Sequence, residues 1–131
     1  MNITGMNIMV LVGLKLSSRK LKKMIVKLKL KNPDYPDLSD KQSYFVLGIE
    51  ADDFRILNDH GKPYLYSSAL FNVIDSHEPN DWVVEIGDGG ERYAYPELLN
   101  KVGFFEDFFE QKNEQTSIFW HVVNKMLSEA A

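Results

Sequence analysis

Runs in which apolar and polar residues alternate dominate the chain between residues 24 and 96. They lie at Met24 to Lys31, Phe54 to Leu57, Tyr64 to Tyr66, Trp82 to Ile86 and Tyr93 to Tyr95. Successive side chains of a β-strand point to opposite faces, so alternation is typical of strands that bury one face. The pattern therefore predicts a β-rich structure over this part of the chain.

Turn-forming residues join four of these runs in pairs. Asn58 to Gly61 separates the first pair, and Asp88 to Gly90 separates the second. Asn, Asp and Gly tolerate the positive φ angles that a tight reversal needs. We expect two β-hairpins, and hence a mainly antiparallel sheet.

One further strand is expected from Tyr44 to Glu50, where aromatic and β-branched residues are concentrated. It follows a predicted loop over residues 32–42, and Ala51 to Asp53 should turn it into the first hairpin. The alternation assigns Phe45, Leu47 and Ile49 to one face and Tyr44, Val46 and Gly48 to the other. Because both faces are largely apolar, this strand should lie centrally in the sheet.

Helical signals occur between and after the hairpins. Ser67 to Asp75 predicts a short helix or helical turn with a serine cap, in which Leu70 and Ile74 share a face. Pro96 suits the first turn of a second helix, Glu97 favours the positive end of its dipole, and Gly103 should interrupt it.

Two apolar helical faces follow near the end of the chain. Phe104, Phe105, Phe108 and Phe109 fall on one side of a helix. A final helix over about 116–129 places one stripe against the sheet, formed by Ile118, Phe119, Val122, Val123, Met126 and Leu127. The predicted class is α+β, a hairpin-built sheet with the Phe-rich and C-terminal helices packed on one face.

Composition supports one folded unit. The 131 residues are 44% apolar and contain no cysteine, which excludes disulfides, Cys-based zinc sites and a Cys nucleophile. We expect a single domain over residues 24–131 in a cytoplasmic protein. Residues 1–23 form a basic segment for which three interpretations are open: a flexible tail, an amphipathic arm that binds a membrane surface or nucleic acid, or a stretch upstream of a true start at Met24, which we favour. The apolar run in this segment is too short to span a bilayer.

Charge divides the chain sharply. Residues 1–32 carry eight bases and no acid, whereas residues 33–131 carry seven bases and nineteen acids, a formal charge of −12. So acidic a body repels nucleic acid and attracts basic proteins. We expect a basic protein partner, with neither nucleic acid nor membrane bound.

Aromatic residues and acids near the strand ends and the Phe-rich helix are the candidate contacts for such a partner. Aromatic side chains dominate binding energies, and acids set association rates. The candidates are Trp82, Tyr93, Tyr95, Asp88, Glu91, Glu106 and Asp107.

Candidate chemistry is sparse. His60 lies beside Asp59, and His77 follows Asp75, which is compatible with acid–base roles but is also typical of solvated turns. The spacing of His77, Glu78 and Asp81 matches no metal motif. We therefore assign no catalytic residue, metal or cofactor.

A resemblance accompanies these patterns over residues 44–110. It rests on FRILND at 54–59, PYLY at 63–66, the Phe71-x-Val73-Ile74-Asp75 step, Pro79-x-x-Trp82, GERYAYPEL at 90–98 and GFFEDFF at 103–109. Together these segments resemble a group of small, mostly uncharacterised bacterial proteins, some of which serve as immunity partners in polymorphic toxin systems. The resemblance implies an immunity-like, protein-binding role.

Three hypotheses follow. The first is an acidic, non-enzymatic binding protein that neutralises a basic partner such as a toxin. The second is a small hydrolase that uses His60 or His77 with Asp59, Asp75 or Asp81. The third is a non-catalytic subunit of a larger complex.

Overall fold

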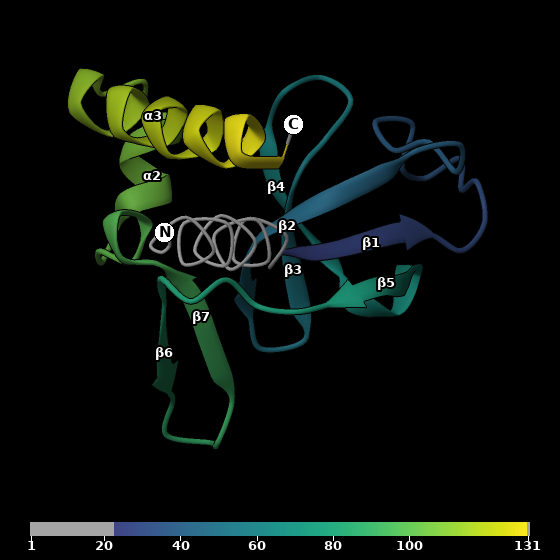
Figure 1. The fold of residues 1–131 in the computed structure, drawn as a ribbon, viewed down its shortest axis with the longest axis horizontal. Helices are drawn as coiled ribbons and strands as arrows, with labels where there is room; N and C mark the ends of the chain where they lie inside the picture. The colour runs from purple at the N-terminus through teal and green to yellow at the C-terminus, as the bar shows by residue number, and fades with distance from the viewer. Residues whose placement is uncertain (1–22, 131) are drawn as a thin grey trace, which may run out of the picture.

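A computed structural model describes residues 23–130 (Figure 1). The strands are β1 (Met24–Leu28), β2 (Ser43–Glu50), β3 (Asp53–Leu57), β4 (Pro63–Ser67), β5 (Phe71–Ser76), β6 (Trp82–Ile86) and β7 (Arg92–Pro96). The helices of this part of the chain are two 3₁₀ turns, η1 (Ser68–Leu70) and η2 (Glu97–Leu99), and two α-helices, α2 (Phe104–Phe109) and α3 (Asn113–Ala130). The α+β class predicted from the sequence is confirmed.

The strand β2 organises the sheet because it belongs to two groups of strands. All pairings are antiparallel, and one edge of β2 pairs with β3, which pairs with β4. The other edge pairs with β1 near its start and with β7 near its end. The order is therefore β5-β1-β2 in one group and β4-β3-β2-β7-β6 in the other. The central position predicted for this strand is confirmed.

A β-bulge between Val46 and Gly48 allows β2 to pair with strands of both groups. A bulge adds one residue to a strand, so the side chains beyond it change face. As a result Ile49 joins Tyr44 and Val46 in the same core, while Leu47 lies in another. The strict alternation predicted for this strand was wrong at this point.

Two clusters of buried apolar residues form the core of the described part of the chain. The first lies between the two groups of strands and contains Met24, Val26, Leu28, Leu38, Tyr44, Val46, Ile49, Phe54, Ile56, Tyr66, Phe71 and Ala94. The second lies between the sheet and the helices and contains Leu47, Tyr95, Leu99, Phe104, Phe105, Phe119 and Val123. The first strand and the first hairpin contribute to the first cluster, whereas the second hairpin contributes Ala94 and the partly buried Trp82. Val84 and Ile86 are exposed, so the buried face predicted for the run from Trp82 to Ile86 was wrong beyond Trp82.

The helices α2 and α3 cover one side of the sheet, and the β6–β7 hairpin extends away from the body (Figure 1). Phe119 and Val123 are fully buried, so the predicted stripe of the C-terminal helix is confirmed at its centre. Leu127 and Phe109 are more than 40% exposed. For these two residues the prediction of a buried face was wrong, because each lies at the end of its helix.

The helix predicted over Ser67 to Asp75 is only a single turn. Ser67 Oγ accepts a hydrogen bond from the Ala69 N–H and caps η1, as expected. The following residues form β5, which pairs with β1 over its whole length. Because Phe71 is buried in the first core, strand pairing determines this segment, and the predicted face of Leu70 and Ile74 does not exist.

The helix predicted from Pro96 is likewise short. Pro96 ends β7 and precedes η2, and Gly103, at a φ of 76°, separates η2 from α2 as predicted.

Within residues 23–130 no helix is long and apolar enough to cross a membrane. The prediction of a basic extension concerns residues 1–23, of which all but Lys23 lie outside the described part of the chain.

Candidate site for a basic partner

A cleft of about 480 Å³ opens where the end of β2 meets β6, β7 and the start of α2. Three carboxylates, Glu50, Glu85 and Glu106, line it. Arg55, Asn100 and Lys101 also line it, and aromatic and aliphatic side chains form much of the remaining wall, among them Leu65, Tyr93, Tyr95, Val102, Phe105 and Phe109. We call this feature the acidic cleft.

Strand register brings two of the three carboxylates to this cleft. Tyr93 on β7 is paired with Glu50 on one side and with Glu85 on the other, so all three side chains lie in one row across the sheet. Directly paired residues have Cβ atoms about 5 Å apart. Glu106 reaches the same cleft from the first turn of α2, where a carboxylate also favours the helix dipole.

A buried arginine forms the floor of the acidic cleft. Arg55 on β3 is 7% exposed. Its Nη2 lies 2.7 Å from Glu50 Oε2, its Nε donates to Tyr95 Oη at 2.9 Å, and its Nη1 donates to the Pro63 carbonyl at 3.0 Å. The guanidinium also lies 3.9 Å from the centre of the Phe105 ring. A buried charge needs such compensation, so this network fixes the shape of the floor.

The phenol of Tyr95 completes the network by donating to Glu50 Oε2 at 2.6 Å. Burial raises the pKa of Tyr95 above its ordinary value of 10.0, and the nearby Arg55 only partly opposes this shift. Tyr95 therefore stays a neutral donor at physiological pH. Glu50 accepts from both neighbours and holds them in one orientation.

Gly48 makes this position of Tyr95 possible. A Cβ atom at Gly48 would lie 2.1 Å from Tyr95 Cε1, far inside van der Waals contact. The Tyr95 ring thus lies directly across the backbone of β2. Close approach of a side chain to backbone is a common reason for glycine within a strand.

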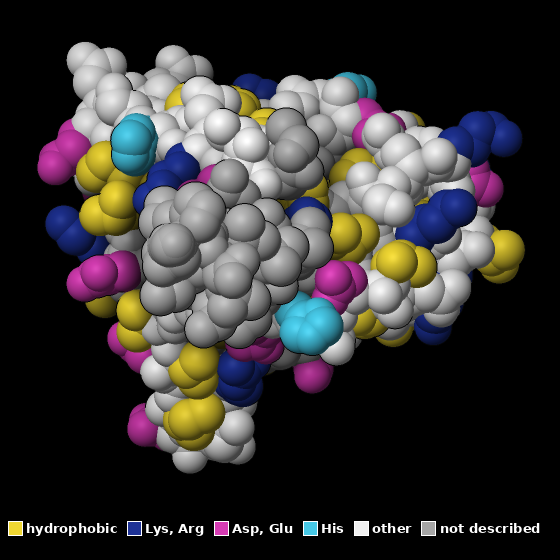
Figure 2. Space-filling model, in the orientation of Figure 1, with side chains coloured by type: hydrophobic (Ala, Val, Ile, Leu, Met, Phe, Trp, Pro, Cys, Tyr) yellow, Lys and Arg dark blue, Asp and Glu magenta, His cyan; other side chains and the backbone are white. Residues whose placement is uncertain are grey.

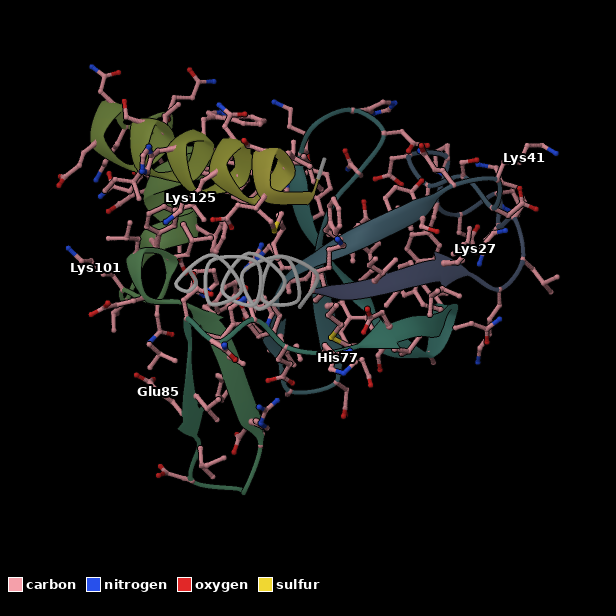
Figure 3. All side chains as sticks on the ribbon, viewed as in Figure 1. Lys27, Lys41, His77, Glu85, Lys101 and Lys125 are labelled. Carbon is pink, nitrogen blue, oxygen red and sulfur yellow. The ribbon has the colours of Figure 1, made fainter. Side chains whose placement is uncertain are left out.

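The lining of the acidic cleft holds three carboxylates and one exposed base, Lys101. Burial, followed by the charges of Glu91 and Glu50, raises the pKa of Tyr93. Glu85 and Glu106 are exposed, and Figure 3 shows Glu85 on β6 on the side of the molecule that also carries Lys101. Figure 2 shows hydrophobic side chains beside carboxylates along the projecting β6–β7 hairpin.

A second cleft, of about 580 Å³, lies between the β1–β2 loop and the β3–β4 hairpin. Its walls include Asp34, Tyr35, Asp37, Tyr64 and Tyr66, and we call it the tyrosine cleft. Tyr66 Oη donates to Asp37 Oδ2 at 2.6 Å, and Asn58 Nδ2 donates to the same oxygen at 3.0 Å. These bonds attach the loop to the hairpin and fix the wall between them.

The structure brings three of the predicted contact residues together, since Tyr93, Tyr95 and Glu106 all line the acidic cleft. Trp82 instead packs against the first core. The remaining three line neither cleft: Glu91 accepts from the Gly89 N–H at 2.8 Å, Asp107 pairs with Lys112 at 3.0 Å, and Asp88 lies in the exposed β6–β7 turn.

Sequence reasoning missed Glu50, Arg55, Glu85 and Phe105. One signal in the sequence could have drawn attention to Arg55, because this charged residue lies between the apolar residues Phe54 and Ile56 of a predicted strand. A charged residue at such a position is almost never buried unless it is paired. Of its partners, Glu50 and Pro63 lie five and eight residues away in sequence and Tyr95 lies forty residues away, so the pattern of one strand does not identify all three.

The two histidines named for a hydrolase, His60 and His77, lie in separate turns. His60 is exposed in the β3–β4 turn and lines the tyrosine cleft, whereas His77 is exposed after β5 and lines neither cleft. His77 Nδ1 lies 2.6 Å from Asp75 Oδ1. Asp59 directs its carboxylate to Tyr44 and Gln42. The residues named for a hydrolase are therefore not gathered in one cluster.

Within residues 23–130 no group of three or more His, Asp or Glu side chains is placed to hold a metal ion. Comparison of the chain with protein-family models, curated proteins and solved structures gives no match.

Proposed function

We propose that this chain is a protein-binding module whose acidic cleft receives a cationic side chain of a basic partner. The single observation that carries the proposal is the geometry of that cleft, in which Glu50, Glu85 and Glu106 converge from three elements over an aromatic wall. Carboxylates supply charge complementarity, and aromatic faces attract cations further.

The cleft offers two kinds of contact to a Lys or Arg side chain. The exposed carboxylates Glu85 and Glu106 would pair with its charged end, while Tyr93 and Phe109 would cover its aliphatic stem. Glu50 is already engaged by Arg55, so it contributes less to the incoming charge. The rigid floor keeps the side chains in position and lowers the entropy cost of binding.

The net charge of residues 33–131 supports the same proposal. A formal charge of −12 over residues 33–131 accelerates encounter with a basic surface by electrostatic steering. Proteins that bind nucleic acid carry basic surfaces of this kind. The partner class that we propose is such a basic protein, including a toxin whose active site this chain covers in the bacterial cytoplasm.

The proposal is tested by capture from lysate of the source cell with three versions of the chain. They are the wild type, the cleft variant Glu85→Lys/Glu106→Lys, and the control variant Glu114→Lys/Glu129→Lys on α3. All four positions are exposed, and each double variant changes the net charge by the same amount. Circular dichroism would establish that all three are folded.

We expect the wild type and the α3 variant to retain a basic protein at low salt that the cleft variant loses. Raised salt should release the same protein, because exposed charge pairs are screened. Equal retention by the two double variants would contradict the acidic cleft as the site. Retention that salt does not change would contradict the electrostatic mechanism.

A further inference from the structure

The acidic cleft and the tyrosine cleft share a wall. Arg55 and Leu65 line both, although one cleft faces the β1–β2 loop and the other faces α2. Tyr64, from the tyrosine cleft, lies with its ring centre 5.6 Å from that of Phe109, from the acidic cleft. The two clefts are therefore adjacent depressions on one surface.

The ridge between the clefts is apolar and accessible. Tyr64 is 44% exposed, Leu65 is 37% exposed and Phe109 is 42% exposed. Exposed apolar groups that adjoin one another are typical of protein-binding surfaces. A chain that crosses this ridge would bury them.

Both clefts carry carboxylates and aromatic rings. Asp34 and Asp37 line the tyrosine cleft beside Tyr35, Tyr64 and Tyr66. Together the two linings hold five carboxylates against two permanent cations, Arg55 and Lys101. Charge complementarity therefore favours a cationic group on each side of the ridge.

The hydrogen-bond donors of Arg55 independently indicate which kind of partner group lies between the two clefts. A guanidinium has five N–H groups. Arg55 uses three of them, on Tyr95, Glu50 and Pro63, and within the described residues the other two have no hydrogen-bond acceptor. Buried donors without an acceptor are costly, and Arg55 is among the residues that line both clefts. A peptide carbonyl crossing the ridge is an acceptor of the required kind.

From these observations we propose that the two clefts form one bipartite groove for an extended basic segment of the partner. One cationic side chain enters each cleft, and a backbone carbonyl between them accepts from Arg55. This inference rests on the proposed function and adds to it the form of the recognised segment, which carries two cations at a defined spacing.

The test uses synthetic peptides and calorimetry on the whole 131-residue chain at low salt. The probes are acetyl-Arg-amide and peptides with two arginines separated by one, two or three alanines. In an extended chain, side chains an even number of positions apart point the same way. We expect one spacing to bind about tenfold or more tightly than the single arginine, because the second contact becomes intramolecular.

Three single variants separate the two proposals. Glu106→Gln alters the acidic cleft, Asp34→Asn alters the tyrosine cleft, and Glu129→Gln on α3 is the control; all three positions are exposed. We expect each cleft variant to lower the affinity for the best two-arginine peptide by up to about fivefold, which is the contribution of an exposed ion pair. The control variant should leave this affinity unchanged.

The outcomes distinguish the two proposals. If Glu106→Gln weakens binding while Asp34→Asn does not, or if no spacing exceeds the single arginine, the bipartite groove is overturned and the acidic cleft stands. If Asp34→Asn alone weakens binding, or if no probe binds, both proposals are overturned. Loss in both cleft variants together with a preferred spacing supports the groove.

Discussion

Gly48 is the residue on which the geometry of the acidic cleft depends most directly. Tyr95 crosses it, and that ring is held by hydrogen bonds to Glu50 and Arg55. A side chain at position 48 would therefore meet an aromatic ring that is not free to move away. The cleft floor thus requires glycine at one position in the middle of a strand.

We predict that Gly48→Ala lowers the free energy of unfolding by about 2 kcal/mol or more, as overpacking does in rigid cores. Urea denaturation would measure it. The matched control is Gly89→Ala, whose added Cβ would come no closer than 3.3 Å to the flexible side chain of Glu91. A Gly48→Ala protein that is as stable as this control would contradict the close packing of Tyr95.

The buried tyrosines predict a response to alkaline pH. Burial raises the pKa of both Tyr66 and Tyr95 above the ordinary value of 10.0. Their neutral forms are therefore favoured in the folded state, and this contribution to stability is complete below pH 10. It is lost as pH rises from 10 through the raised folded values, because the unfolded chain then ionises first.

Ultraviolet absorbance would follow tyrosinate formation alongside circular dichroism. Of the six tyrosines, Tyr66 and Tyr95 should ionise only together with unfolding. In Tyr66→Phe/Tyr95→Phe the stability should fall less steeply above pH 10 than in the wild type. Free titration of all six in the folded protein would show that these phenols are not buried.

Among the elements, α3 packs against α2 and η2 and contributes two buried residues, Phe119 and Val123, to the second core. Phe119 is fully buried against Phe105 and Phe108, with ring centres 6.1 Å and 4.6 Å away. We predict that Phe119→Ala costs about 3–5 kcal/mol of unfolding free energy, as other large buried aromatic truncations do.

The matched control for this helix is Leu127→Ala, on the same helix but 43% exposed. It should change stability by less than about 0.5 kcal/mol, as surface substitutions do. Thermal or urea denaturation would compare the two. A similar loss in both variants would argue against the packing of α3 on the second core.

The local sequence pattern predicted the strands and helices better than it predicted how the strands pair. Both hairpins and the C-terminal stripe follow from alternation, turn residues and helical spacing within short windows. The bulge at Val46 to Gly48 was missed although glycine within a strand often marks one, because the pairing of β2 with β1, β3 and β7 is not visible in a short window. The segment from Phe71 to Ser76 forms β5 for a similar reason, since pairing with β1 outweighs its helical spacing.

The candidate site was predictable only in part. Tyr93, Tyr95 and Glu106 stand out as aromatic residues and an acid near expected element ends. Glu50, Arg55 and Tyr95 meet only because β2, β3 and β7 lie side by side, and these contacts join residues up to 45 positions apart. Sequence alone gives the residue types of such a network but not its assembly.

At the scale of the whole molecule, the distribution of charged residues and the aromatic wall of the acidic cleft both bear on how a basic partner would bind. Figure 3 places Lys27 and Lys41 at the edge of the view opposite Glu85, and Lys101 is the one exposed base in the lining of the acidic cleft. An acidic body would then bring a basic partner close, and the aromatic wall would hold it. Association should therefore be more sensitive to salt than dissociation.

The measurement that tests the central claim most directly is an NMR titration of the ¹⁵N-labelled chain with acetyl-arginine amide, at low and at raised salt. We predict the largest amide shifts at Tyr93, Tyr95 and Glu106, with little change along α3, and a loss of these shifts at raised salt. No shifts, or shifts that are largest on α3, would contradict the acidic cleft as a binding site for cationic side chains.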